Sequence, residues 1–301
     1  MKKHLFFFLV LPIARFHPRW RVYLATATAT IGLFSSCGSD QQTDTNKVNP
    51  QDTVIPTDSS RKSQVKAFFY SLPSPLAMAA VFKSSGLPYL EGLCNNPESV
   101  SKYQGMRTQC INMGVYNTDL AYNLINNQTQ NSLKYLECIK KLSDGLGLNS
   151  IFESDNYLSR FKSNMSKNDS LAMIFSDLKR EVDMFVYDNK KQDIALFIFT
   201  GAWVESMYIS TQSTKNKTNN LVANTIADQK FVLENLMRLL NDYNNEPNFK
   251  ELFLDLNDIQ KDFQKLATQG EDENAKVMVN ERDLKVVTEK ISAFRTKIIN
   301  Q

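Results

Sequence analysis

One set of polar side chains occurs twice in the sequence and has residue types that can do chemistry. Each copy has a carboxylate, a tyrosine three residues later and an amide four residues after that. The two copies are Asp119, Tyr122 and Asn126, and Glu205, Tyr208 and Gln212. On an α-helix these offsets place all three groups on one stripe. The tyrosine hydroxyl can therefore donate a hydrogen bond to the carboxylate one turn away.

Three hypotheses account for these paired stripes. The surrounding residues are apolar, so the stripes should point inward or into a groove, where a carboxylate must be paired or hydrogen-bonded. The first hypothesis, which we favour, is a structural polar network that locks two central helices together. The second is a pocket for a cationic or polyhydroxylated small molecule, with Trp203 and Tyr116 as apolar walls. The third is an enzyme that uses the two carboxylates as acid and base, as glycosidases do. Carboxylates on the helices of a bundle rarely face an open substrate cleft, which speaks against this third hypothesis.

Other catalytic or metal chemistry finds little support in the sequence. Both histidines, His4 and His17, lie in the N-terminal leader, so the rest of the chain has no histidine. This excludes Ser-His and Cys-His catalysis and histidine-ligated metal sites in that part. The sequence also lacks a Walker loop, a GxSxG elbow, an HExxH helix, an EF-hand loop and a GxGxxG motif. We therefore expect no enzymatic activity, no catalytic residue, no metal and no cofactor.

The N-terminal leader has the features of a bacterial export signal. A basic segment precedes the apolar run Val22–Phe34, whose 13 residues are too few to span a bilayer, which takes about 20. The run leads into Ser35-Ser36-Cys37-Gly38, which resembles the lipobox of bacterial lipoproteins. That resemblance implies a signal peptide over residues 1–36, cleavage before Cys37, and diacylglycerol and palmitate on this cysteine. The alternative is an ordinary leader in which Cys37 is incidental.

Residues 37–62 should connect the lipid anchor to the body of the protein. After Cys37 the segment is polar, contains two prolines and offers nothing to bury. As a flexible coil it would hold the body on the order of 25–30 Å from the anchor. The expected location is the bacterial cell envelope, at the outer membrane. The sequence leaves open whether the protein faces the periplasm or the cell surface.

The net charge gives no indication of nucleic-acid binding. The leader contains five basic and no acidic residues, so 35 minus these five leaves 30 basic against 32 acidic side chains. A nearly neutral body lacks the clustered positive charge that nucleic-acid binding requires.

The body, residues 63–301, should be all-α. Apolar residues recur at helical spacing, and Pro75, Pro97 and Pro247 mark first helical turns. Asn168 and Asn280 are expected to be N-caps. The expected fold is a bundle of about eight or nine antiparallel helices joined by short connections. These helices should span residues 74–85, 98–127, 129–146, 155–165, 169–189, 191–214, 218–243, 247–268 and 281–299.

Two further features concern the interior of the bundle. Ile194–Val204 is the most apolar run and should lie in a buried central helix, with Gly201 at a close helix contact. Cys94, Cys110 and Cys138 are an odd set, which permits at most one intramolecular disulfide. Cys110 and Cys138 could pair or could serve as small buried hydrophobic side chains, and we favour the second interpretation.

Several short segments between Ser63 and Ser213 carry a further signal: Tyr70–Pro75, Val100–Tyr103, Asn112–Tyr122, Asn127–Gln130 and Gly201–Trp203 followed by Glu205 and Tyr208. Together they resemble a family of uncharacterised helical lipoproteins of Bacteroidetes-type bacteria. The resemblance implies an envelope location and an all-α fold, and it implies no particular activity.

Together these features predict a non-enzymatic, lipid-anchored helical bundle that binds another envelope component. The alternative is a small-molecule-binding lipoprotein whose pocket contains the acid and tyrosine residues of the paired stripes. In both cases the partners would be the membrane, through the N-terminal lipid, and either an envelope protein or a small molecule.

Overall fold

The computed structural model describes residues 72–215, 219–243, 246–268 and 278–301. These residues belong to a unit that spans Ile55–Gln301, separate from Met1–Val54. The predicted signal peptide 1–36, the lipid attachment at Cys37, the tether 37–62 and the first residues of the predicted body, 63–71, lie outside the described residues.

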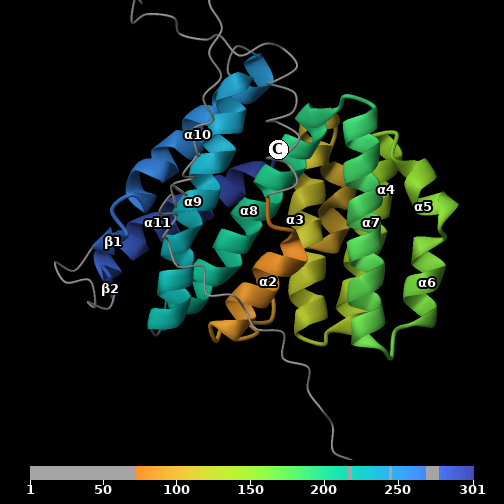
Figure 1. Ribbon diagram of the computed structural model, residues 1–301, viewed down its shortest axis with the longest axis horizontal. Coiled ribbons are helices and arrows are strands. Elements are labelled where there is room, and N and C mark those ends of the chain that lie inside the picture. The colour runs from red at the N-terminus through yellow and green to blue at the C-terminus, as the bar shows by residue number, and fades with distance from the viewer. Residues whose placement is uncertain (1–71, 216–218, 244–245, 269–277) are drawn as a thin grey trace, which may run out of the picture. The chain divides into compact units, whose positions relative to one another are not determined.

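The described part of the chain is all-α, as the sequence predicted, and forms a helical bundle (Figure 1). Two-residue strands, β1 (Ala267–Thr268) and β2 (Met278–Val279), pair in antiparallel register beside it. The helical elements are α2 (Pro75–Ser84), the 3₁₀-helix η1 (Pro97–Lys102), α3 (Met106–Ile125), α4 (Thr129–Gly145), α5 (Asn149–Ser154), α6 (Tyr157–Ser163), α7 (Asn168–Asp188), α8 (Gln192–Thr214), α9 (Asn220–Asp242), α10 (Pro247–Phe263) and α11 (Glu281–Ile299).

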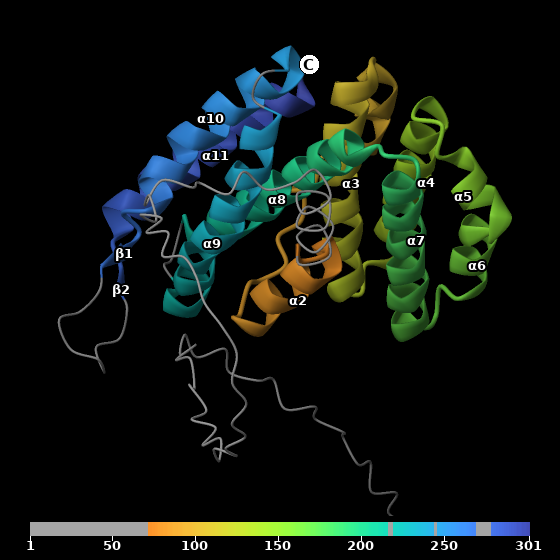
Figure 2. The same ribbon diagram turned by 45° about the horizontal axis from the view of Figure 1, so that its top comes forward.

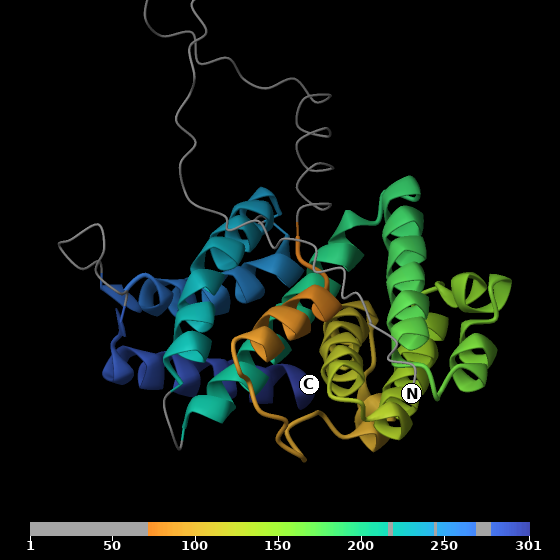
Figure 3. The same ribbon diagram turned by 60° about the horizontal axis from the view of Figure 1, so that its bottom comes forward.

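Helices α3 and α8 form the centre of the bundle. Helices α4 to α7 lie on the α3 side, and α9 to α11 lie on the α8 side, where α10 and α11 run next to each other (Figure 2). Helix α2 packs against both central helices (Figure 3). The two stripes of polar residues therefore lie on the central helices α3 and α8, which the other helices surround.

Two glycines bring the backbones of α3 and α8 into direct contact. A Cβ atom on Gly201 would lie 1.9 Å from the carbonyl oxygen of Ile111, and one on Gly114 would lie 1.9 Å from that of Ile198. No other residue fits at either position without moving a helix. Close by, the Thr118 hydroxyl donates a hydrogen bond to the carbonyl of Ala202 at 2.9 Å. The close contact expected at Gly201 is present, and it sets the register between the two polar stripes.

Helix α8 is long and apolar enough to cross a membrane by length and composition alone. Its most apolar window is 78% buried within the bundle, and its side chains Leu196, Phe197, Trp203 and Val204 are fully buried. It is the core helix of the bundle, in keeping with the expectation for Ile194–Val204.

The structure corrects the predicted helix over residues 98–127. The segment divides into η1 and α3, because Gly105 adopts a positive φ of 79° that a continuing helix does not allow. The predicted helix over 155–165 corresponds to α6. The short helix α5, which directly precedes α6, was not predicted. Asn156 separates these two helices with a left-handed φ of 53°.

Two predictions at helix ends were also wrong. The predicted helix 247–268 stops at Phe263, and the chain then enters the short strand β1. Asn168 is the first residue of α7 and Lys167 is its N-cap, while the side-chain amide of Asn168 donates to the Asn127 side chain of an earlier connection. Asn280 does cap α11, where its side chain accepts a hydrogen bond from the backbone N–H of Arg282.

Candidate functional site

The carboxylate of Glu205 forms a buried ion pair with Arg295 of α11. Arg295 Nε donates to Glu205 Oε2 and Arg295 Nη2 donates to Glu205 Oε1, each at 2.9 Å. Glu205 is fully buried and Arg295 is only 8% exposed. The guanidinium also lies over the ring of Tyr208, with its central carbon 4.2 Å from the ring centroid. Two parallel hydrogen bonds and a cation–π contact thus hold the charge that α11 brings into the core.

The carboxyl of Asp119 lies in the same buried region but has no cation of its own. Its Oδ2 accepts a hydrogen bond from the backbone N–H of Asn95 at 3.1 Å, and the thiol of Cys94 also contacts the carboxyl. Its Oδ1 has no hydrogen-bond partner among the described residues. Burial raises the pKa of Asp119 well above its usual value, and the charge of Glu205 raises it further, while Arg295 acts in the opposite direction.

One arginine therefore serves two carboxylates. Burial opposes the charge on Arg295, but Glu205 and then Asp119 raise its pKa above the ordinary arginine value. Arg295 donates its hydrogen bonds to Glu205 and to the Leu93 carbonyl and none to Asp119, so burial and the Glu205 charge favour the neutral form of Asp119. Glu205 and Arg295 thus form an ion pair that joins α8 to α11, with a neutral Asp119 beside it. This arrangement differs from an acid and a base that face a substrate.

The tyrosine of the α3 stripe holds the chain between α2 and η1, and the amide residue holds the end of α2. The Tyr122 hydroxyl accepts a hydrogen bond from the backbone N–H of Leu90 at 2.7 Å and donates to the carbonyl of Pro88 at 3.2 Å. Burial raises the pKa of Tyr122 to about 12, so this hydroxyl stays protonated. Asn126 accepts a hydrogen bond from Lys83 Nζ at 2.6 Å.

The same connection is fixed at three further points. The backbone N–H of Asn95 donates to Asp119, and Arg295 Nη2 donates to the carbonyl of Leu93 at 3.3 Å. Tyr116, expected as an apolar wall, donates its hydroxyl to the carbonyl of Asn96 at 2.9 Å. An irregular connection buried against a core needs partners for its backbone polar groups, and these side chains supply them.

The remaining predicted residues are placed within the packing of α8. Gln212 donates its amide to the Ser292 hydroxyl of α11 at 2.9 Å, and Trp203 packs against Phe263 with ring centroids 5.6 Å apart. A cavity of only about 10 Å³ beside Tyr122, lined also by Thr118 and Ser206, is about the size of one water molecule.

The two stripes lie in packed surroundings and not around a ligand-sized space. Their hydrogen bonds join α8 to α11 and α3 to the connection before η1, whereas the first hypothesis had them lock α3 to α8. The hydroxyl of Tyr122 donates to the carbonyl of Pro88, so the hydrogen bond to the Asp119 carboxylate that the helical spacing allowed is not formed.

Arg295 is the residue that sequence reasoning missed. It lies 90 residues after Glu205, and no local pattern connects the two. One signal was available, since Arg295 follows Ile291 by four residues and Leu284 by eleven, which are spacings of the buried stripe of α11. A charge at a core position of an amphipathic helix calls for a buried counter-charge.

Among the residues that the structure describes, Cys94, Cys110 and Cys138 are free thiols, and the Cys110–Cys138 disulfide considered from the sequence is not formed. Burial raises the pKa of Cys138 to about 12 and that of the other two further still. Within the same ranges, no group of three or more His, Cys, Asp or Glu side chains is placed to hold a metal ion.

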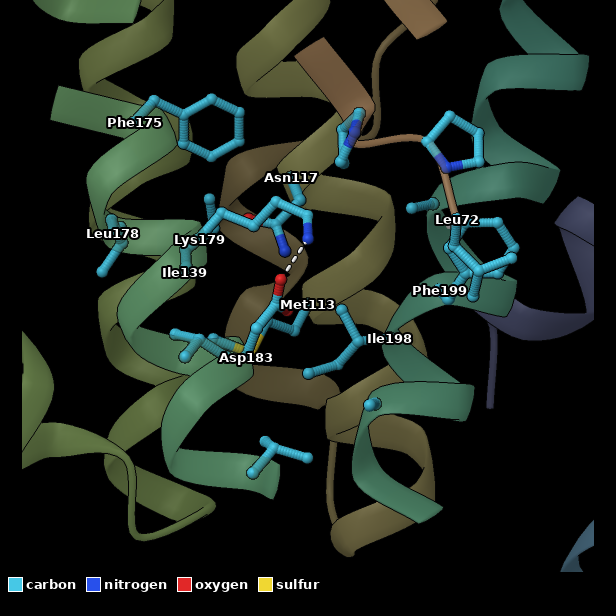
Figure 4. Close-up of a pocket in the computed structure, with 16 residues that line it drawn as sticks. Leu72, Met113, Asn117, Ile139, Phe175, Leu178, Lys179, Asp183, Ile198 and Phe199 are labelled. Atoms are coloured by element: carbon cyan, nitrogen blue, oxygen red, sulfur yellow. Dashed lines mark hydrogen bonds and ion pairs between the residues drawn. The ribbon is translucent and has the colours of Figure 1, made fainter. Parts of the chain in front are cut away.

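A different part of the described bundle carries an open apolar groove. The groove lies between α7 and α8, with α3 at its floor and Leu72, Pro73 and Pro75 at one edge (Figure 4). Its cavity volume is about 70 Å³, enough for a few waters or for one or two inserted side chains. The apolar side chains along it include Met113, Phe175, Leu178, Val182, Ile198 and Phe199.

Three polar side chains converge within this groove. Lys179 and Asp183, one turn apart on α7, form an ion pair, and Asn117 of α3 lies beside them (Figure 4). Both charged side chains remain about one-third or more exposed, at 34% and 40%. An apolar groove with a few polar groups at one place is the usual composition of a binding site in a protein.

No protein-family model matches this chain, and neither a curated protein nor a solved structure shows significant similarity to it.

Proposed function

We propose that this protein is a lipid-anchored, non-enzymatic binding protein of the bacterial envelope, and that the groove between α7 and α8 receives its partner. The observation that carries the proposal is the groove itself. It is apolar, it opens to solvent on a well-packed body, and it contains a cluster of donors and acceptors at Asn117, Lys179 and Asp183. Exposed apolar surface rimmed by polar groups is typical of interaction sites.

The acid and tyrosine residues support the small-molecule alternative less well. Asp119 and Glu205 are completely buried, and their partners are the backbone N–H of Asn95 and the side chain of Arg295. A ligand would have to displace the bidentate ion pair to reach Glu205, and the backbone N–H of Asn95 to reach Asp119. Breaking such a pair leaves an uncompensated buried charge, which is strongly unfavourable.

Crosslinking in the native host tests the binding role of the groove. The anchored protein would be crosslinked, isolated and analysed by mass spectrometry, alongside two variants. Ala195→Trp fills the groove, whereas Ala80→Trp places the same side chain on an exposed position of α2 outside it. We expect a partner that is captured by the wild type and by Ala80→Trp and is lost with Ala195→Trp. Equal capture by all three proteins would exclude the groove as the binding site.

Metabolic labelling tests the lipid anchor separately. With a fatty-acid analogue, we expect label on the wild type and none on Cys37→Ser, which should also accumulate as an unprocessed precursor. Label on the variant at the wild-type level would refute attachment at Cys37. The two experiments are independent, so the anchor and the binding role can fail separately.

A further inference from the structure

The described chain enters the body at the edge of the groove. Leu72, Pro73 and Pro75, the first residues of the described range and of α2, line one edge of the groove (Figure 4). Whatever precedes Leu72 is therefore covalently attached beside an open apolar surface. Attachment through so short a connection gives an effective concentration in the millimolar range, without any contribution from affinity.

The residues immediately before Leu72 are unusually apolar for their surroundings. Ala67-Phe68-Phe69-Tyr70 is a run of four apolar or aromatic residues, whereas residues 38–62 are almost entirely polar. Aromatic side chains bury more apolar area than most others, and removing them from water is favourable. The described part of the groove offers apolar side chains from α3, α4, α7 and α8 for such contacts.

The distances permit these aromatic residues to reach the groove. Phe69 precedes Leu72 by three residues, and an extended chain covers about 3.3–3.6 Å per residue, so Phe69 can lie about 10 Å from Leu72. The groove side of α7 runs from Phe175 to Val186, which is about 16 Å of helix. The aromatic run can thus extend along much of the groove without any change in the described body.

We propose that the segment Ala67–Tyr70 inserts Phe68 or Phe69 into the groove between α7 and α8 and thereby competes with the external partner. The inference rests on the proposed function of the groove as a binding site and adds its regulation. A partner must displace a segment directly connected to the membrane tether. Binding would then free the tether-proximal residues and lengthen the reach of the body from its anchor.

Photocrosslinking in the full chain tests this directly. 4-Benzoylphenylalanine would replace Phe69 in one protein and, as the control, Thr57 of the polar segment in another. We expect position 69 to crosslink within the same chain to groove-lining peptides of α7 or α8, and position 57 not to do so. Crosslinks from position 69 to other helices, to a second copy of the chain or to no peptide would overturn the proposal.

Binding of an environment-sensitive apolar dye gives a second test that does not depend on a modified residue. If the segment fills the groove nine-tenths of the time, its removal raises the apparent dye affinity about tenfold. We expect this rise for Phe68→Ser/Phe69→Ser and not for Phe231→Ser, which changes an exposed aromatic residue of α9. Adding Ala195→Trp to the double variant should abolish the gain. An unchanged dye affinity in the double variant would contradict the inference.

The outcomes separate this inference from the proposed function. If the partner is lost with Ala195→Trp but position 69 does not crosslink to the groove, the groove binds a partner and is not occupied by its own chain. If position 69 crosslinks to the groove and Ala195→Trp changes no captured partner, the segment covers the groove and the proposed binding role fails.

Discussion

Two parts of the same helix, α8, differ in almost every physical respect. Its middle and C-terminal part carries Gly201, Glu205 and Tyr208, which contact α3 and α11 in a sealed polar junction. Its N-terminal part carries Ala195, Ile198 and Phe199, which line an open apolar groove. The polar residues that suggest chemistry in the sequence fix a connection and a helix in place. The surface suited to binding consists of residues that resemble ordinary core. In a helical bundle, residue type alone does not show whether a side chain stabilises the fold or binds a partner, because this depends on how deeply the side chain is buried.

Glu205→Gln should have the largest effect, and it tests whether the junction is a brace. Removing one partner of a buried ion pair leaves Arg295 uncompensated, which costs about 3–5 kcal/mol of unfolding free energy. Chemical denaturation would measure it. Arg295→Met should be similarly destabilising, and the double variant should lose much less than the sum of the two. A loss below about 1 kcal/mol for Glu205→Gln would show that the pair contributes little.

Gly201→Ala should be the next most harmful change. The added methyl group would meet the Ile111 carbonyl at 1.9 Å, so α3 and α8 would have to separate. Overpacking of this kind costs about 1–3 kcal/mol, and backbone contact places this case at the upper end. Gly145→Ala is the matched control, because its new Cβ would meet only the movable amide of Gln109. Equal melting temperatures for the two variants would contradict the close contact.

Asp119→Asn should show a pH-dependent effect. Burial and the charge of Glu205 raise the pKa of Asp119 in the folded state. The contribution of Asp119 to stability is therefore complete below the ordinary aspartate pKa of about 3.9, and it is lost as pH rises toward the folded-state pKa. Asparagine does not titrate. The stability of the variant relative to the wild type should therefore increase between pH 4 and pH 8, by at most about 1.4 kcal/mol per pH unit. Denaturation across this range checks it, with Asp144→Asn at an exposed position as the control. A difference independent of pH would mean that Asp119 is ionised throughout.

Lys179→Met should have the smallest effect on stability. The ion pair with Asp183 is partly exposed and lies at i,i+4 on α7, so its loss should cost at most about 1 kcal/mol. Lys140→Met breaks a comparable exposed pair with Asp144 on α4 and serves as the control. A much larger loss in thermal denaturation for Lys179→Met would place this part of the groove in the core and weaken the contrast between the two parts of α8.

The helices were largely predictable because their signals are local. Pro75, Pro97 and Pro247 mark helix starts that the structure confirms, and the apolar periodicity locates the buried faces. The breaks at Gly105 and Asn156 were missed because a positive φ depends on what the neighbouring segment packs against. The pairing of Glu205 with Arg295 joins residues on different helices, so helical spacing gave no information about it. The groove was also unpredictable, since it depends on how far α7 lies from α8.

The placement of Arg295 on α11 has a consequence for the order in which the chain can fold during synthesis. The Glu205 carboxylate belongs to a helix that is made well before its cation, which comes 90 residues after Glu205. Until α11 arrives, closing α3 on α8 would bury this carboxylate without a counter-ion, so partial chains should stay open or dynamic at this junction. A chain that crosses a membrane unfolded benefits from such a delay, because its native core cannot close prematurely. The core would thus close only after α11 has been made, which suits the export across a membrane that the leader predicts.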